Sequence, residues 1–258
     1  MRSFLEQADG AVALPRLGGM ARPNGVMIVS ERFWAFSGTD GRLVEGRMPK
    51  LPAGVRRLPL VRGIARLTLS FAPLMRREGP TRRLERISLL LAVVLPFALV
   101  LLSERAALVA GLVLTVGLLA MLFRGRTLTL HGAEHRAIAA AETRQLASTW
   151  EGAARPSRFS LRCGTNFAAL AAPVTFAADR AWPLPFALWT PLVVTVLSLA
   201  LTMELWQLVQ ASGHRAARVL LAPGLALQRL TTREPALEET RVALRAVASV
   251  IRRETASA

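Results

Sequence analysis

The chain has 258 residues, is 52% hydrophobic and has a mean hydropathy of +0.38, which is more apolar than a soluble domain of this length needs. Its formal charge of +16 would suggest nucleic acid in a soluble protein, but the arginines avoid the apolar runs and gather on their flanks. Composition therefore argues against nucleic acid as a partner and for a lipid bilayer. A lone cysteine, Cys163, excludes an intramolecular disulfide.

The N-terminal region, residues 1–85, is predicted to hold a small β-structure and an amphipathic helix on the cytoplasmic side. Residues 25–48 carry short apolar stretches around an Asp40-Gly41 turn signal, which predicts a β-hairpin or meander. From Leu60 to Arg77 the apolar residues are interrupted by arginines. This pattern predicts either a helix on the membrane surface with its arginines among lipid headgroups, or an ordinary helix packed on the hairpin.

A first transmembrane hairpin is predicted within residues 86–123. Two uncharged apolar runs, Ile87 to Leu102 and Ala106 to Phe123, are separated by only three residues around Glu104. Each run would reach about 25 Å at ~1.5 Å per residue, which is at the short end for a membrane span. A helical hairpin with its tight turn facing outward is the resulting interpretation.

A second transmembrane hairpin is predicted within residues 167–206. Its first run, Phe167 to Ala178, is short and contains Pro173, so alone it would fit a re-entrant segment, whereas Leu184 to Met203 is long enough to span. An even number of crossings keeps every arginine block in the cytoplasm. We therefore expect a mainly α-helical membrane protein with about four spans in two hairpins and both termini cytoplasmic.

Two further segments are predicted to be cytoplasmic, residues 124–166 between the hairpins and residues 207–258 after them. A helix-start signal at Thr231, Thr232 and Pro235 precedes an apolar stripe at helical spacing. The stripe consists of Ala243, Ala246, Val247, Val250 and Ile251. This pattern predicts an amphipathic helix packed on the rest of the protein or on the membrane surface.

The string HGAEHRAIAAAETRQ is the strongest candidate for chemistry. His131, Glu134, His135 and Glu142 share one face of a helix. Two imidazoles one turn apart can hold a divalent cation, zinc first among the candidates, and Glu134 beside them can act as a general base. The same string has the H-x-x-E-H form of one class of zinc proteases. The alternative is a solvated helix whose histidines and glutamates pair with nearby arginines.

The third metal ligand is left open by the sequence. Glu142 lies on the same helix, Cys163 offers a thiolate in the Arg162-Cys163-Gly164-Thr165 turn, and Glu204 lies at the cytoplasmic end of the fourth span. A carboxylate at the end of a span is costly unless it meets water, an arginine or a metal. Pairing of Glu204 with an arginine is therefore the alternative to metal binding.

An ordered set of motifs covers nearly the whole chain. The motifs are Gly18-Gly19, Gly25-Val26-Met27, Pro59 to Gly63, His131 to His135 with Glu142, Arg162 to Thr165, Glu204, and Pro223 to Pro235. In these residues the chain resembles the YqhQ-like bacterial membrane proteins, an uncharacterised family often labelled as predicted metal-dependent enzymes. The resemblance implies a multi-pass protein of the bacterial inner membrane.

The chain departs from that family's pattern at several positions. Met20 replaces a glutamine, Asn24 a glutamate, Ser160 a histidine, Ala141 a tyrosine and Arg241 a glutamate. Serine and asparagine bind divalent cations more weakly than imidazole and carboxylate, so the departures imply a divergent member with a reduced ligand set.

Three functional hypotheses follow. The first is a metal-dependent membrane enzyme, or its degenerate paralogue, with its site at the cytoplasmic face. The alternative is a non-enzymatic scaffold, assembly factor or subunit of a membrane protein complex. A third hypothesis is that the arginine clusters bind anionic lipid headgroups.

Overall fold

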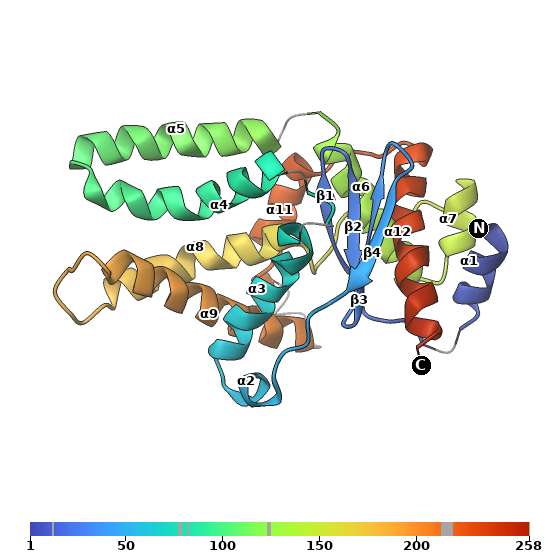
Figure 1. Ribbon diagram of the computed structural model, residues 1–258, viewed down its shortest axis with the longest axis horizontal. Helices are drawn as coiled ribbons and strands as arrows, with labels where there is room; N and C mark the ends of the chain where they lie inside the picture. The colour runs from blue at the N-terminus through green and yellow to red at the C-terminus, as the bar shows by residue number, and fades with distance from the viewer. Residues whose placement is uncertain (12, 77–78, 82, 123–124, 213–218, 258) are drawn as a thin grey trace. The chain divides into compact units, whose positions relative to one another are not determined.

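The computed structural model describes residues 1–11, 13–76, 79–81, 83–122, 125–212 and 219–257 (Figure 1). Contacts divide the chain into two units. The sheet unit consists of Met1–Lys50, Phe123–Cys163 and Leu225–Ala258, and the helical unit of Leu51–Leu122 and Gly164–Gly224. The sheet unit thus joins three stretches that are far apart in the sequence. Among the flanking arginines, Arg77, Arg82, Arg124, Arg215 and Arg218 lie outside the described residues.

A four-stranded antiparallel meander forms the centre of the sheet unit, in the order β1-β2-β3-β4. Its strands are β1 (Gly18–Arg22), β2 (Gly25–Val29), β3 (Phe33–Gly38) and β4 (Leu43–Arg47). The turn between β3 and β4 lies at Asp40-Gly41, where Gly41 has φ +85° and the Asp40 carboxylate accepts the Arg42 N–H at 3.0 Å. The predicted meander is confirmed, with β1 as an additional strand at its edge.

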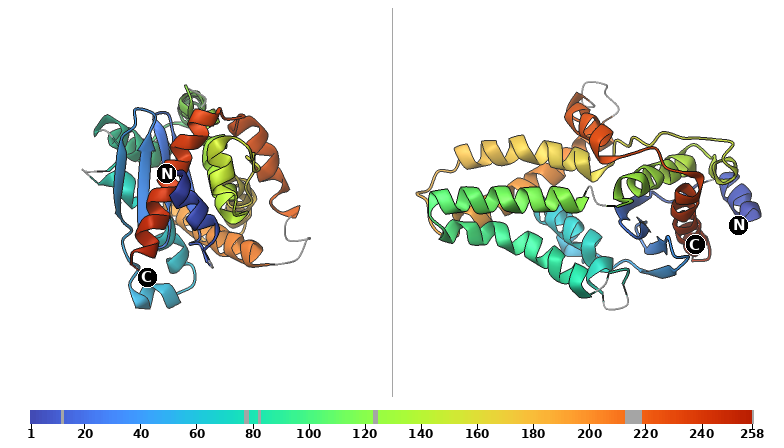
Figure 2. Two further views of the ribbon diagram at one scale, coloured as in Figure 1. Left: turned by 90° about the vertical axis from the view of Figure 1, so that its right-hand side faces the viewer. Right: turned by 90° about the horizontal axis from the view of Figure 1, so that it is seen from above.

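The sheet unit also holds helices α1 (Arg2–Asp9), α6 (Thr127–Glu142), α7 (Leu146–Glu151) and α12 (Leu237–Thr255). Helices α6 and α12 pack on one face of the sheet and bury a common core with Val26, Ile28 and Ala35 (Figure 2). The predicted stripe of α12 is buried in this core. The apolar stripe of α12 therefore packs on the rest of the protein, which was one of the two possibilities that the sequence left open.

Helix α6 is buried on most of its surface, because alanines and one glycine allow neighbouring segments to come close. A Cβ at Gly132 would lie 2.1 Å from the carbonyl oxygen of Arg233. The Arg233 N–H donates to the carbonyl oxygen of Leu128 at 2.9 Å, so the chain after α11 (Ala222–Thr231) crosses directly over α6. Only glycine leaves room for this crossing.

The helical unit consists of α2 (Ala53–Arg57), α3 (Val61–Met75), α4 (Arg83–Ala98), a 3₁₀ turn (Leu99–Leu101), α5 (Glu104–Leu122), α8 (Gly164–Arg180) and α9 (Thr190–Ala211). Helices α8 and α9 pack along each other, and α3 packs on α9. At this contact a Cβ on Gly63 would collide with Met203. Two arginines of α3 reach polar groups of α9. Arg62 pairs with Glu204, and Arg66 donates to Gln207 at 3.2 Å.

Among the described residues, α9 is the helix long and apolar enough to cross a bilayer, and α5 adds the shorter apolar stretch Arg105–Leu118. The other predicted spans stay predictions. Large apolar side chains nevertheless face outward along the helical unit, among them Val93 and Val94 on α4, Leu108, Leu112 and Val113 on α5, and Phe176 on α8, each more than half exposed. Exposed apolar side chains in such number on these helices indicate a contact with another molecule or with lipid.

Candidate metal centre

Helix α6 presents two histidines one turn apart, and their imidazole rings lie edge to face with centroids 4.5 Å apart. The Sγ atom of Cys163 lies 3.3 Å from Nε2 of His131. One ligand atom from each of His131, His135 and Cys163 lies within 4.8 Å of the other two. Of the third ligands that the sequence left open, the structure brings Cys163 to the histidine pair.

Backbone carbonyls hold both imidazoles in one orientation. Nδ1 of His131 lies 2.8 Å from the carbonyl oxygen of Thr231, and Nδ1 of His135 lies 2.7 Å from that of Arg158. A carbonyl oxygen only accepts, so each Nδ1 carries a proton and donates it. A neutral imidazole protonated at Nδ1 has its lone pair at Nε2. The lone pair of His131 faces the Cys163 thiol, and a metal that displaces the thiol proton would be bound by both imidazoles through Nε2, in the arrangement usual for histidine ligands.

The Nε2 atom of His135 is buried and has no hydrogen-bond partner among the described residues. A buried acceptor without a partner is costly, and such groups are rare in native proteins. A cation between His131, His135 and Cys163 would satisfy this lone pair. The buried, unpartnered Nε2 atom therefore supports metal binding independently of the spacing of the histidines in the sequence.

Burial also holds the two histidines in the neutral state that metal binding requires. It lowers the pKa of His131, against the raising effect of the Thr231 carbonyl. It lowers the pKa of His135 to about 4, with a further lowering from the neighbouring charge of His131 and a raising effect from the Arg158 carbonyl. At neutral pH both rings are therefore unprotonated at Nε2.

Glu134, the predicted general base, lies against the sheet. Burial raises the pKa of its carboxyl to about 8, while a hydrogen bond from the backbone of Ala21 in β1 acts in the opposite direction. A Cβ at Gly19 would come within 2.7 Å of the Glu134 side chain, so a larger residue at this point of the strand would have to displace that buried side chain. These contacts hold Glu134 between α6 and β1.

The two remaining predicted ligands bind arginines. Glu142 pairs with Arg162, the residue before Cys163. In the helical unit, Glu204 accepts the Arg62 Nε–H at 2.9 Å and the Leu60 N–H at 3.1 Å. Both carboxylates thus have the arginine partners that the sequence offered as the alternative to a metal.

Sequence reasoning missed the groups that orient the ligands. Thr231 and Arg158 act through backbone carbonyls, which leave no residue-type signal in a sequence. The buried Arg136 escaped as well, although it donates to the Pro156 carbonyl oxygen at 3.1 Å and to Glu234 at 2.7 Å, holding both segments against α6. Gly132 was the one available signal, because a glycine inside a helix often marks a close approach.

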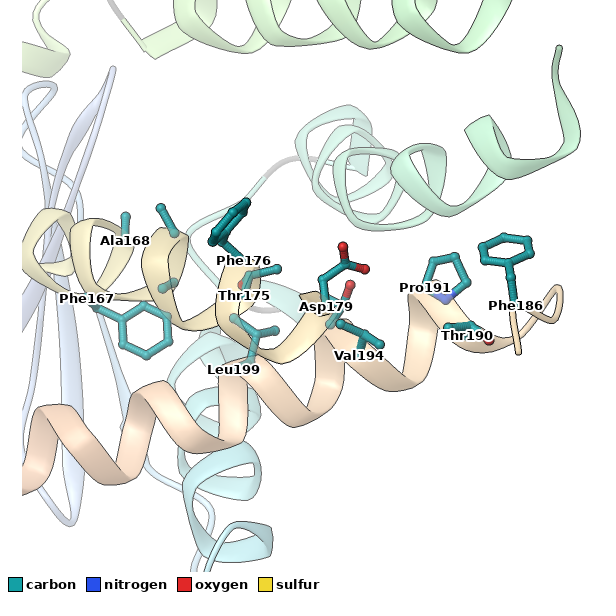
Figure 3. A pocket seen from close by; sticks show the side chains of 13 residues that line it. Phe167, Ala168, Thr175, Phe176, Asp179, Phe186, Thr190, Pro191, Val194 and Leu199 are labelled. Atoms are coloured by element: carbon teal, nitrogen blue, oxygen red, sulfur yellow. The ribbon is translucent and has the colours of Figure 1, made fainter. Parts of the chain in front are cut away.

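A hollow of about 800 Å³ lies between α8 and α9 in the helical unit (Figure 3). Its lining is mostly apolar, with Phe167 and Phe176 from α8 and Val194 and Leu199 from α9, and Asp179 is the charged residue at its margin. It is an open apolar groove without the clustered ligand groups of the histidine site.

The profile of one family, described as proteins of unknown function and designated DUF1385, matches residues 87–253, which is more than half of the chain. The chain belongs to the DUF1385 family. No curated protein and no solved structure matches it. The DUF1385 match includes the histidine pair, Cys163 and Glu204 but begins after the sheet. An uncharacterised family is thus established, while the YqhQ-like name remains a resemblance.

Proposed function

We propose that this DUF1385 protein is a metal-dependent enzyme of the bacterial inner membrane, with a divalent cation held by His131, His135 and Cys163. The proposal is carried by the gathering of ligand atoms of His131, His135 and Cys163 within 4.8 Å of one another, with Nε2 of His135 buried and without a hydrogen-bond partner among the described residues. Two imidazoles and a thiolate are ligands that zinc favours, and three protein ligands leave a fourth position open for a substrate. Zinc in such a site supplies Lewis-acid chemistry.

The membrane location is supported by the apolar exterior of the helical unit. Helix α9 is long and apolar enough to span, and the groove between α8 and α9 offers the kind of surface that acyl chains cover. The arginine-rich segments would then meet the cytoplasmic leaflet, with its anionic lipids, and both termini would be cytoplasmic.

Metal analysis of detergent-purified protein tests the proposal. We expect about one equivalent of zinc in the wild type and loss of most of it in His131→Ala, His135→Ala and Cys163→Ser. Thr143→Ala is the matched control, because it alters the exposed end of the same helix, where the hydroxyl donates to the Ala139 carbonyl oxygen, and should retain the metal. Wild-type protein that stays metal-free after zinc reconstitution, or ligand variants that keep full occupancy, would refute it.

The alternative function is a scaffold or complex subunit in which the metal is structural. It is favoured by one observation, the placement of Glu134 against β1, which leaves the proposed base in contact with the sheet. A structural metal would link α6 to the Cys163 segment and stabilise the sheet unit. Chelation would then lower the melting temperature strongly, and the protein would co-purify with a stable partner.

A further inference from the structure

Gln228 of α11 is fully buried, and its amide pairs with both backbone groups of Ser160. The Ser160 N–H donates to Oε1 of Gln228 at 2.8 Å, and Nε2 of Gln228 donates to the Ser160 carbonyl oxygen at 2.7 Å. The Gln228 side chain thus makes to the Ser160 backbone the same two hydrogen bonds that a directly opposite residue makes in an antiparallel sheet. It joins segments separated by 68 positions in the sequence.

The two segments joined in this way carry the groups that build the metal centre outside α6. The Ser160 segment contains Cys163 and the Arg158 carbonyl that orients His135. The Gln228 segment contains the Thr231 carbonyl that orients His131. A third contact reinforces the junction, because Nη1 of Arg158 donates to the Thr232 carbonyl oxygen at 2.7 Å.

We propose that Gln228 is a positioning residue of the metal centre, which sets the Cys163 segment at the distance where its thiolate meets both imidazole lone pairs. The inference rests on the proposed metal site. Residues 154–160 lie outside regular secondary structure, so no helix or strand ladder fixes Ser160 independently. A buried two-bond contact therefore has a direct effect on where Cys163 lies.

The chemistry of the contact requires an amide. Gln228 presents one acceptor and one donor to a backbone that offers one donor and one acceptor. A carboxylate in its place would keep the bond from the Ser160 N–H but set a charge against the Ser160 carbonyl oxygen. A methionine of similar length would fill the space and form neither bond.

Cobalt-substituted protein gives the sharpest test, because the thiolate–cobalt charge-transfer band and the ligand-field bands report Cys163 geometry directly. We expect Gln228→Met to weaken the charge-transfer band, shift the ligand-field bands and lower zinc affinity by about 10- to 100-fold. Gln228→Glu should give a smaller change of the same kind. Thermal unfolding of the metal-free variants shows how much general stability each has lost.

Ser249→Ala is the matched control, since it removes a side-chain contact to Glu45 in the same unit without touching the metal centre. It should lower stability while leaving the cobalt spectrum unchanged. If Gln228→Met has the spectrum and zinc affinity of the wild type, the positioning role is wrong but the metal site stands. The same conclusion follows if Ser249→Ala changes the spectrum as much as Gln228→Met does. A wild type that binds neither zinc nor cobalt overturns the proposed function itself. If Gln228→Met fails to fold, Gln228→Glu decides by the same readouts.

Discussion

His131 and His135 are oriented by backbone carbonyls rather than by carboxylates. A carbonyl fixes the Nδ1 proton without adding negative charge, so the histidines stay weaker donors than they would be beside an aspartate. The thiolate of Cys163 would then supply the single negative charge among the three ligands. With a divalent cation the ligand set keeps a net positive charge, which favours an anionic group at the open position.

Gly132 should be intolerant of substitution. In Gly132→Ala the new Cβ meets the backbone carbonyl of Arg233, which cannot rotate away, so the crossing segment must shift. We expect a loss of about 1–3 kcal/mol in the free energy of unfolding and weaker metal binding, because Thr231 moves with the segment. Denaturant titration with and without zinc measures both effects.

Gly10 supplies the comparison for that experiment. A Cβ at Gly10 would meet its nearest neighbour at an ordinary 3.7 Å, and φ there is negative. Gly10→Ala should therefore leave stability and metal affinity near their wild-type values. Equal effects of the two substitutions would mean that the close approach at Gly132 has no special role.

Gly19 and Glu134 should be energetically coupled. Gly19→Ala places a methyl group against the buried Glu134 side chain, and we expect it to cost about 1–2 kcal/mol. In a Glu134→Ala background, Gly19→Ala should lower the free energy of unfolding much less, because the Glu134 atoms that the new methyl group meets are absent. A double-mutant cycle from unfolding free energies measures the coupling, and strictly additive changes would argue against the contact.

At the scale of elements, the junction of α3 with α9 contains a strained turn. Leu60 has φ +65°, and the Val61 N–H donates to the Pro59 carbonyl oxygen at 2.7 Å, which together define a tight γ-turn. A branched residue at positive φ is unfavourable and persists only where other contacts impose it. Glu204 makes those contacts by accepting from both Leu60 and Arg62.

Removal of Glu204 should therefore loosen the start of α3. In Glu204→Ala we expect backbone amides of Val61 to Ile64 to exchange about tenfold faster or more, equivalent to ~1.4 kcal/mol. Glu204→Gln, which keeps an acceptor for the Leu60 N–H, should show a smaller increase. Hydrogen exchange read by mass spectrometry checks this, and unchanged protection in Glu204→Ala would show that α3 holds its turn unaided.

Sequence pattern predicted the elements with strong local signals. Asp40-Gly41 marked the β3–β4 turn, and the regular stripe of α12 marked a packed helix. Strand β1 was not predicted, because its sequence begins with two glycines and lacks the alternation of apolar and polar residues that is typical of a strand. At the site, the spacing of His131 and His135 predicted the shared face, but the choice among Glu142, Cys163 and Glu204 depended on tertiary pairing with arginines, which has no local signature.

At the scale of the whole molecule, the apolar exterior predicts behaviour in lipid. We expect the protein to fractionate with membranes and to require detergent for extraction, because the outward-facing side chains of α4, α5 and α8 would otherwise meet water. Extraction by carbonate or high salt alone would contradict this expectation.

Topology can be tested with single cysteines in a Cys163→Ser background. With Ser257→Cys at the C-terminal end, a membrane-impermeant maleimide should label only permeabilised cells if that end is cytoplasmic. With Ser103→Cys in the turn between α4 and α5, it should label intact spheroplasts if that turn faces outward. Labelling of the C-terminal cysteine in intact spheroplasts would reverse the proposed orientation.

The sheet unit is discontinuous, and its last helix, α12, supplies a large part of its core. On a ribosome, α6 therefore emerges long before the helix that shields it, and the Thr231 carbonyl that orients His131 also emerges late. Between them the chain synthesises the whole of α8 and α9. If His131, His135 and Cys163 bind a metal as proposed, the complete centre would form only after α8, α9 and the Thr231 segment have been synthesised, and metal binding would report completed folding of the sheet unit.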